Sequence, residues 1–221
     1  MRISCALLTI FFLATSCQNK TKNKSDEQMA VKSPVQTQLV NGYDRAYFAS
    51  GCFWCVEAIF ESLKGVKEAK SGYSGGTEKN PTYKQVSYGK TSHAEAVEVY
   101  YDSDVISFET LVEVFFGSQD PTTPNRQGPD KGRQYRSIAF YQNEKEKEII
   151  DNVIDRLNKT TFNGEIVTEV LPFQKFWTAE DYHQNYERNN PSNPYIQNVS
   201  IPRINRFKAK FPELLKENAI H

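Results

Sequence analysis

Residues 46–64 read AYFASGCFWCVEAIFESLK, and this stretch predicts a strand that turns sharply into a helix. The apolar run 46–49 is typical of a short buried strand. Four apolar residues then follow at helical spacing: Val56, Ile59, Phe60 and Leu63. Gly65 is placed to end that helix. The close pair Cys52 and Cys55 therefore lies at a turn between a strand and a helix.

The rest of the chain alternates between the two kinds of element. Strands are predicted at 94–101, 135–141 and 166–171. Helices are predicted at 108–116, 144–157 and 203–215. A further helix is expected to begin at Ala179, with Thr178 as its N-cap. Because strands and helices are interspersed, the sequence predicts an α+β fold with one mixed sheet.

The composition limits the size and the partners of the protein. The chain has 221 residues, of which 38% are hydrophobic, so it can build one main domain but not two large ones. Lysine plus arginine (27) equals aspartate plus glutamate (27). Such a balance gives no general attraction to nucleic acid or to an anionic membrane. We expect a monomer with no nucleic-acid partner.

The N-terminus predicts export. Arg2 precedes an apolar run at 6–14 that is too short to span a membrane, and a polar segment follows at once. Residues 1–17 also resemble a bacterial lipoprotein signal, which implies lipidation of Cys17 and anchoring in the cell envelope or periplasm. The alternative is an ordinary signal peptide cleaved nearby. Residues 18–42 are polar and predict a flexible tether, so the folded domain is expected at 43–221.

Only Cys52 and Cys55 remain for the folded domain, because Cys5 and Cys17 lie in the signal segment. One pair excludes a disulfide-rich scaffold. A thiol at a helix N-terminus is expected to have a lowered pKa, which would make Cys52 a nucleophile rather than an inert buried cysteine. A zinc site lacks a second pair of ligands at suitable spacing. A thioredoxin-like disulfide exchanger remains an alternative.

Glu95 is the candidate acid. In the predicted strand 94–101 it shares the more apolar face with Val97, Val99 and Tyr101. A carboxyl group in apolar surroundings favours its neutral form and can donate a proton near neutral pH. The alternative is a strand-end glutamate that reaches water. A nucleophilic thiol with a neutral acid suits attack on an electrophilic sulfur whose oxygen must leave, whereas disulfide exchange needs no such acid.

Several separated stretches together resemble the A-type peptide methionine sulfoxide reductases. They are 51–57 (GCFWCVE), 93–97 (HAEAV), 120–123 (DPTT), 125–130 (NRQGPD), 134–137 (QYRS) and 180–184 (EDYHQ). They occur in the expected order between about residues 43 and 211. The resemblance implies a two-layer α/β sandwich with a mixed sheet and a ferredoxin-like core. It also implies reduction of the S epimer of methionine sulfoxide, without a cofactor, at the expense of an external thiol such as thioredoxin or dithiothreitol.

The resemblance also implies roles for individual residues. Cys52 would attack the sulfoxide sulfur, and Glu95 would protonate the departing oxygen. The other matching positions would bind substrate: Phe53 and Trp54 around the methyl group, Tyr83 and Tyr135 at the oxygen, and Asp130 and Tyr195 in the same pocket. Taken singly, each aromatic residue could instead be core, and Asp130 could simply make a turn. His183 is expected to be structural.

The chain departs from the family pattern at its second cysteine. Many members have glycine at the position of Cys55 and a cysteine after a tyrosine near the C-terminus, where this chain has Tyr195-Ile196. A sulfenic acid condenses readily with a nearby thiol. Residues three apart at a helix start are close enough for a disulfide. We therefore expect Cys55 to be the resolving cysteine. The alternative for Cys55 is a packed thiol, with an external thiol reducing the sulfenic acid directly. The alternative for the whole protein is a non-catalytic lipoprotein that binds methionine-rich partners.

Overall fold

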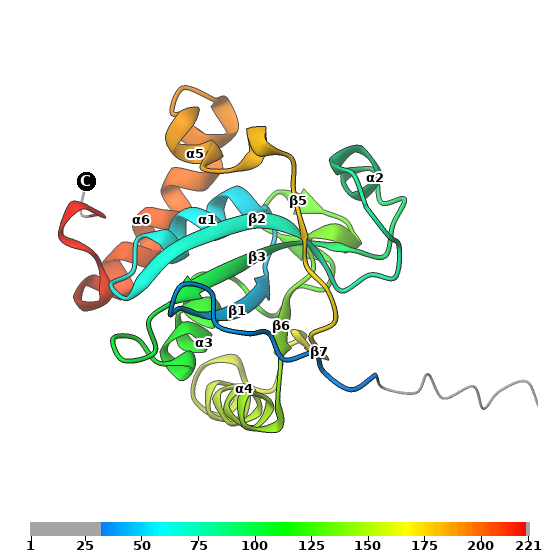
Figure 1. Ribbon diagram of the computed structural model, residues 1–221. Helices are drawn as coiled ribbons and strands as arrows, with labels where there is room; N and C mark the ends of the chain where they lie inside the picture. The colour runs from blue at the N-terminus through cyan, green and yellow to red at the C-terminus, as the bar shows by residue number, and fades with distance from the viewer. Residues whose placement is uncertain (1–31, 220–221) are drawn as a thin grey trace, which may run out of the picture. The chain divides into compact units, whose positions relative to one another are not determined.

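A computed structural model describes residues 32–219 of the protein. Its main sheet has six strands in the order β7-β6-β1-β3-β2-β8 (Figure 1). The strands are β1 (Asp44–Ala49), β2 (Val66–Ser74), β3 (Ala94–Tyr101), β6 (Ile138–Tyr141), β7 (Glu169–Pro172) and β8 (Trp177–Thr178). All neighbours are antiparallel except β6 and β7, so the sheet is mixed. A separate small ribbon pairs β4 (Arg126–Gln127) with β5 (Asp130–Lys131).

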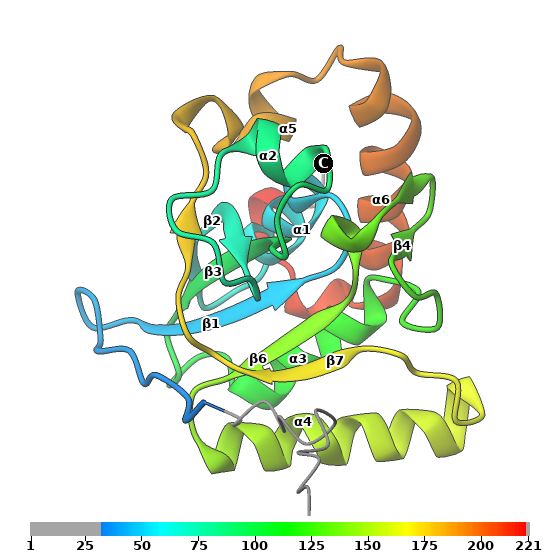
Figure 2. The same cartoon turned by 90° about the vertical axis from the view of Figure 1, so that its right-hand side faces the viewer.

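Six α-helices accompany the sheet within the described residues. They are α1 (Phe53–Glu61), α2 (Tyr83–Ser87), α3 (Phe108–Gly117), α4 (Glu144–Leu157), α5 (Tyr186–Asn189) and α6 (Ile201–Lys210). Short 3₁₀ or π segments lie at 133–135, 158–162, 181–183, 196–200, 212–214 and 217–219. Helix α4 packs against α3 and also contacts β6 and β7 (Figure 2).

The central elements follow a ferredoxin-like path. The chain order β1-α1-β2-β3-α3-β6 gives the sheet order β6-β1-β3-β2, which is the split βαβ arrangement. The predicted α+β class and mixed sheet are therefore confirmed. The sequence patterns for β3 and α4 gave the observed bounds, because strict alternation and a long amphipathic repeat are strong local signals.

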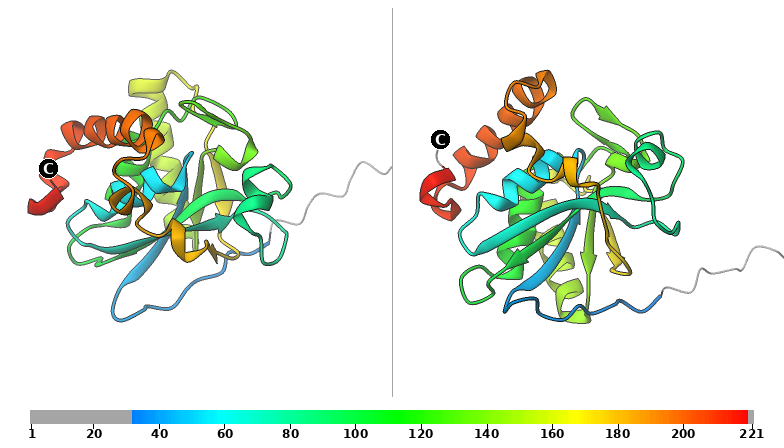
Figure 3. Two further views of the ribbon diagram at one scale, coloured as in Figure 1. Left: turned by 90° about the horizontal axis from the view of Figure 1, so that it is seen from above. Right: turned by 45° about the horizontal axis from the view of Figure 1, so that its top comes forward.

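The two faces of the sheet have different covers (Figure 3). On one face, Phe48 stacks on Phe60 of α1 and on Phe115 of α3, with ring centroids 5.1 Å apart in both pairs. On the other face, Tyr47 stacks at 3.7 Å on Phe173, which lies in the segment after β7. The helices thus form one layer and the sheet the other. The turn at 50–52 connects the two layers, because it joins β1 to α1.

The segment before β1 differs from its prediction as a tether. Within the described part, the backbone N–H of Val35 donates to the carbonyl of Phe173 at 2.8 Å, and the N–H of Thr37 donates to Gln142 at 2.9 Å. Residues from Val35 onward are therefore bound to the domain, because hydrogen bonds to distant residues offset their polar composition. Residues 18–31 of the predicted tether lie outside the described residues, as do the predicted signal 1–17 and Cys17.

Several predicted boundaries also need correction. Helix α1 begins at Phe53 rather than Val56, β6 begins at Ile138 after a 3₁₀ turn, and β7 begins at Glu169. The expected helix from Ala179 is wrong, since Trp177 and Thr178 instead pair with β2 and only a 3₁₀ turn follows. The last α-helix ends at Lys210 and gives way to a 3₁₀ turn. Strand β2 and helix α2 were not predicted.

Candidate active site

One small cavity collects eight of the nine residues that the sequence placed in catalysis or substrate binding. It has a volume of about 150 Å³ and is lined by Cys52, Phe53, Trp54, Tyr83, Glu95, Asp130, Tyr135 and Tyr195. These residues come from five separate regions of the chain, which the fold brings together at the N-terminus of α1. The ninth residue, Cys55, lies beside this cavity and lines a different one.

The turn before α1 places Cys52 at the cavity. Cys52 is the N-cap of α1 and is only 6% exposed. Gly51 has a positive φ of 75°, and a Cβ atom there would lie 2.5 Å from Cβ of Gln127. Only glycine fits this position, because an L side chain would be both strained and in collision with Gln127. The predicted strand-to-helix placement of the cysteine is confirmed.

The expected pKa of Cys52 is wrong in direction. Burial raises the pKa of the Cys52 thiol, and a hydrogen bond to Cys55 and the nearby Glu95 raise it further. The backbone N–H of Trp54 acts in the opposite sense but does not compensate. The hydrogen bond with Cys52 and the positive charge of Arg203 lower the pKa of Cys55 to about 7, against the effect of burial. The two thiols therefore titrate as a pair in which Cys55 is the more acidic member.

Glu95 is buried and held at the start of α1. Its Oε2 accepts a hydrogen bond from the backbone N–H of Phe53 at 3.1 Å, and the residue is 2% exposed. Burial raises the pKa of Glu95 to about 8, with further contributions from Asp130 and Cys55. The carboxyl group is therefore neutral at pH 7 and can donate a proton inside the cavity. This agrees with the expectation from the apolar face of the strand.

An aromatic wall surrounds the apolar side of the cavity. Phe53 is buried, and its ring lies 5.9 Å from Tyr73 and 6.3 Å from Tyr83. The indole N–H of Trp54 donates to Nδ1 of His183 at 3.1 Å, and the Trp54 ring stacks at 3.8 Å on Tyr186. His183 thus orients the wall, in line with the structural role expected for it.

Polar side chains line the rest of the cavity. The hydroxyl of Tyr195 donates to Oδ2 of Asp130 at 2.6 Å, which joins the C-terminal region to the β4–β5 ribbon. Burial raises the pKa of Asp130, while Tyr195 and Arg203 act to lower it. Tyr83 and Tyr135 also border the cavity, and burial raises the pKa of both, so both remain hydroxyl donors.

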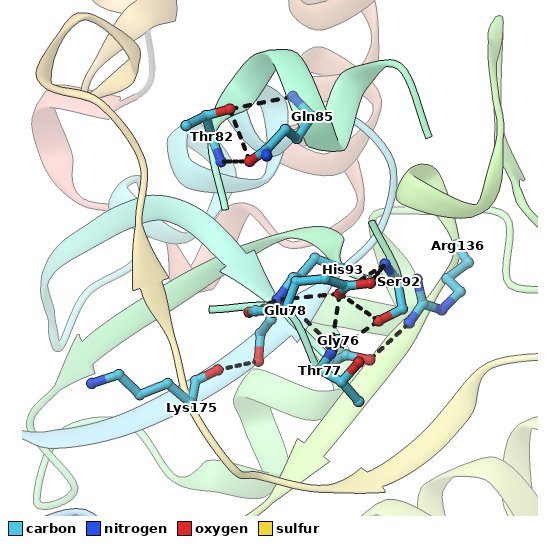
Figure 4. A network of polar contacts seen from close by, with 11 residues as sticks. Gly76, Thr77, Glu78, Thr82, Gln85, Ser92, His93, Arg136 and Lys175 are labelled. Atoms are coloured by element: carbon cyan, nitrogen blue, oxygen red, sulfur yellow. Dashed lines mark hydrogen bonds and ion pairs between the residues drawn. The ribbon is translucent and has the colours of Figure 1, made fainter. Parts of the chain in front are cut away.

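A network of polar contacts holds the loop that carries Tyr83 (Figure 4). The backbone N–H of Gly76 donates to Nδ1 of His93 at 3.2 Å, and Nε2 of His93 lies 2.8 Å from the carbonyl of Glu78. The Glu78 carboxylate accepts from Ser92, both from its hydroxyl at 2.7 Å and from its backbone N–H at 3.0 Å. Both ends of the loop are therefore joined just before β3, the strand that carries Glu95.

Glu57 helps to hold the aromatic wall, a role that no sequence pattern indicated. Its carboxyl group accepts hydrogen bonds from the hydroxyl of Ser71 and from the backbone N–H of Asn185. Asn185 has a positive φ and precedes Tyr186, so Glu57 ties the segment that stacks on Trp54 to helix α1. Burial raises the pKa of Glu57 to about 7.

Cys55 lines a second, larger cavity that adjoins the first. This cavity has a volume of about 640 Å³ and also contacts Arg203 and Arg206 of α6. It shares Asp130 and Tyr195 with the smaller cavity. Cys52 therefore lines the small aromatic cavity, and Cys55 lines the larger neighbouring one.

The site has no candidate for a metal centre, since the described residues contain no group of three or more His, Cys, Asp or Glu side chains in position to hold a metal ion. None of the helices between residues 32 and 219 has the length and hydrophobicity needed to cross a membrane. What the small cavity offers is a buried thiol, a neutral carboxyl group, hydroxyl donors and an apolar wall. Such a set can attack an electrophilic sulfur and protonate its oxygen.

Comparisons with known proteins agree with this chemistry. The family model described as "Peptide methionine sulfoxide reductase" matches residues 44–215. A peptide methionine sulfoxide reductase MsrA of Pasteurella multocida is 49% identical over 78% of this chain and 98% of its own. One from Trichodesmium erythraeum is 47% identical over 77% of this chain and 97% of its own.

Solved structures show the same fold. Reduced Mxr1 from Saccharomyces cerevisiae has a TM-score of 0.65 and 33% identity, and the match covers 71% of this chain and 91% of Mxr1. Methionine sulfoxide reductase A of Corynebacterium diphtheriae has a TM-score of 0.62 and 32% identity, over 73% of this chain and 84% of its own.

Proposed function

This chain belongs to the peptide methionine sulfoxide reductase family, and we propose that it reduces the S epimer of methionine sulfoxide in proteins with Cys52 as its nucleophile. It is an enzyme of the oxidoreductase class. The observation that carries the residue assignment is the meeting of the Cys52 thiol and the neutral carboxyl of Glu95 in one aromatic cavity. A cavity of about 150 Å³ accommodates one small side chain rather than an extended ligand.

In the first step, the Cys52 sulfur attacks the sulfoxide sulfur while Glu95 protonates the oxygen. This attack forms a bond between the two sulfurs, and the protonated oxygen then moves to the Cys52 sulfur as that bond and the S–O bond of the substrate break. The thioether is released, Cys52 becomes a sulfenic acid, and the proton of the Cys52 thiol replaces the one that Glu95 gave up. Phe53 and Trp54 hold the methyl group by apolar contact, and Tyr83 and Tyr135 donate hydrogen bonds to the oxygen. A neutral acid supports this step because proton transfer to the oxygen makes it a better leaving group.

In the second step, Cys55 resolves the sulfenic acid. The hydrogen bond between the two thiols places Cys55 beside Cys52 in the reduced protein, and Cys55 is the more acidic of the two. The thiolate, rather than the thiol, is the nucleophile that attacks another sulfur to make a disulfide. A thioredoxin-like dithiol then reduces the Cys52–Cys55 disulfide and returns the enzyme to its starting state.

One experiment tests the assignment. The purified protein is incubated with peptides that contain either the S or the R epimer of methionine sulfoxide, with dithiothreitol as reductant. We expect thioether from the S epimer alone, and no thioether with Cys52→Ser. Thiol exchange without thioether would instead support a disulfide oxidoreductase, and neither activity would support a binding protein.

Cys55→Ser separates the two steps. With one equivalent of the S epimer, this variant should still form thioether, because oxygen transfer uses Cys52 alone. It should form no Cys52–Cys55 disulfide and should not cycle with thioredoxin. Thioredoxin-driven cycling at the wild-type rate would refute the resolving role and leave the role of Cys52 intact.

We also propose that the protein is exported and attached to the bacterial cell envelope by a lipid on Cys17, where it repairs oxidised envelope proteins. The support is the sequence pattern of residues 1–17. Labelling cells with a radioactive fatty acid should mark the wild-type protein and not Cys17→Ser. An unlabelled wild-type protein of shortened length would instead indicate an ordinary signal peptide.

A further inference from the structure

Arg203 of α6 is a buried cation that donates three hydrogen bonds to neutral acceptors within the described residues. It is 8% exposed. Its Nε donates to the carbonyl of Ser118 at 2.9 Å, Nη1 donates to the carbonyl of Ser50 at 3.0 Å, and Nη2 donates to Oγ of Ser50 at 3.1 Å. None of the ion pairs among the described residues includes it.

A guanidinium in this setting is costly without a nearby anion. Neutral acceptors satisfy its N–H groups, but they do not compensate a positive charge that has lost its water. Two groups beside it can become anions, since Cys55 and Asp130 line the same cavity. Asp130 already accepts a hydrogen bond from Tyr195, whereas the thiolate of Cys55 forms only when its proton leaves.

The position of Arg203 is fixed relative to the reacting turn. Ser50 lies two residues before Cys52, so two of the three hydrogen bonds bind the guanidinium to the strand end that leads into the turn. The third bond ties it to Ser118, just after α3. Three hydrogen bonds hold the planar group in its buried position, whereas Arg206, one helical turn later, is exposed.

We propose that Arg203 is a positioning residue for the resolving step, whose buried charge stabilises the Cys55 thiolate as it attacks the Cys52 sulfenic acid. This inference rests on the proposed function, because it requires Cys55 to be the resolving cysteine. In this step the Cys55 sulfur forms a bond to the Cys52 sulfur, and the S–O bond of the sulfenic acid breaks. The hydroxide that leaves takes up the Cys55 proton and departs as water, so no further oxidant is needed.

The other charged and titratable groups around Cys55 do not replace Arg203. Cys52 and Ser200 each form a hydrogen bond with Cys55, but neither supplies a positive charge. Glu187 interacts electrostatically with Cys55 and opposes a negative charge there. Burial raises the pKa of Glu95 and of Tyr195, so both lie near Cys55 as neutral groups at pH 7 and supply no positive charge. Arg203 is therefore the cation that acts on Cys55 within the described surroundings of the thiol.

The test compares two rates in the same single-turnover experiment over pH 5.5–9. Reduced enzyme is mixed with one equivalent of the S epimer, and quenched samples are analysed by mass spectrometry for thioether and for the Cys52–Cys55 disulfide. For Arg203→Gln we expect thioether formation within about twofold of wild type. The midpoint of the pH profile for disulfide formation should rise by about one unit, which makes this step about tenfold slower below the midpoint.

Two further variants separate charge from structure. Arg203→Lys retains the positive charge, so the midpoint of its pH profile for disulfide formation should lie close to that of wild type. Arg206→Gln removes an exposed charge from the same cavity and should leave both rates unchanged. An unshifted midpoint in Arg203→Gln, or equal shifts in the Gln and Lys variants, would show that Arg203 only supports the turn and would overturn the proposal. Arg203→Met takes the place of Arg203→Gln if the latter does not fold, with the same criterion.

The outcome also separates this proposal from the proposed function. If wild-type enzyme forms thioether but no Cys52–Cys55 disulfide, the resolving role of Cys55 fails, and the role of Arg203 fails with it. If the disulfide forms with the same pH profile in wild type and Arg203→Gln, the resolving role stands and only the role of Arg203 is refuted.

Discussion

Glu95→Gln tests two properties of the buried carboxyl group: its role as the proton donor in oxygen transfer and its effect on stability as pH changes. The amide has nearly the same shape as the carboxyl group, and its oxygen can still accept the 3.1 Å hydrogen bond from the N–H of Phe53. What the variant loses is the acidic proton. A positioned general acid contributes typically about 10²–10⁴-fold to the rate. We expect oxygen transfer to slow by a factor in that range.

The same carboxyl group makes stability depend on pH. Burial raises the pKa of Glu95 from 4.5 to about 8, so between these values the folded state binds more protons than the unfolded state. The free energy of unfolding therefore falls as pH rises through this window. At about 1.4 kcal/mol per pKa unit, the shift corresponds to about 5 kcal/mol of stability that is present below pH 4.5 and lost by pH 8. Glu95→Gln should lack this loss.

Two measurements check these expectations. Single-turnover formation of thioether from pH 6 to 9.5 should fall through pH 8 in wild type, because the acid loses its proton, and should show no such fall in Glu95→Gln. Urea denaturation at pH 5 and pH 8.5 should show a larger loss of stability in wild type than in the variant. Glu98→Gln is the matched control, since Glu98 lies on the same strand but pairs with Arg45 at 3.1 Å outside the cavity.

Some results would refute the reasoning. Oxygen transfer within tenfold of wild type in Glu95→Gln would show that another group donates the proton. An equal pH dependence of stability in wild type and Glu95→Gln would show that Glu95 is not buried as a neutral acid. A loss of oxygen transfer in Glu98→Gln as large as that in Glu95→Gln would mean that the rate reports on the strand rather than on the acid.

Three further predictions concern the walls of the site and the core. Trp54→Phe removes the indole N–H that donates to His183, and steady-state kinetics should show a KM raised about tenfold with a smaller change in kcat. Gly76→Ala brings a Cβ atom within 2.5 Å of the backbone nitrogen of His93, and denaturant unfolding should show a free energy of unfolding lowered by about 1–3 kcal/mol. An unchanged free energy of unfolding would contradict the close packing of this loop. Phe48→Ala removes a fully buried ring and should cost about 3–5 kcal/mol in the same assay, whereas a loss below about 1 kcal/mol would contradict the packing around it.

The local patterns that the sequence predicted correctly share a physical cause. The strand with Glu95 alternates between faces, and α4 repeats its apolar residues at helical spacing. Each signal depends on neighbours within a few residues. The helix predicted from Ala179 was wrong for the opposite reason. Pairing of Trp177 and Thr178 with β2, about 100 residues away in sequence, decides the conformation there.

The sequence by itself determined that Cys52 stands at the start of a helix, that Glu95 faces the apolar side of a strand, and that the ordered motifs belong to one family of reductases. Only the tertiary structure decided which thiol is the more acidic. A helix N-terminus lowers a thiol pKa locally, but burial of Cys52 outweighs this effect, and Arg203, 148 residues after Cys55 in the chain, supplies its charge to Cys55 instead. Desolvation and the distance between charges depend on elements remote in sequence, so no local pattern can encode them.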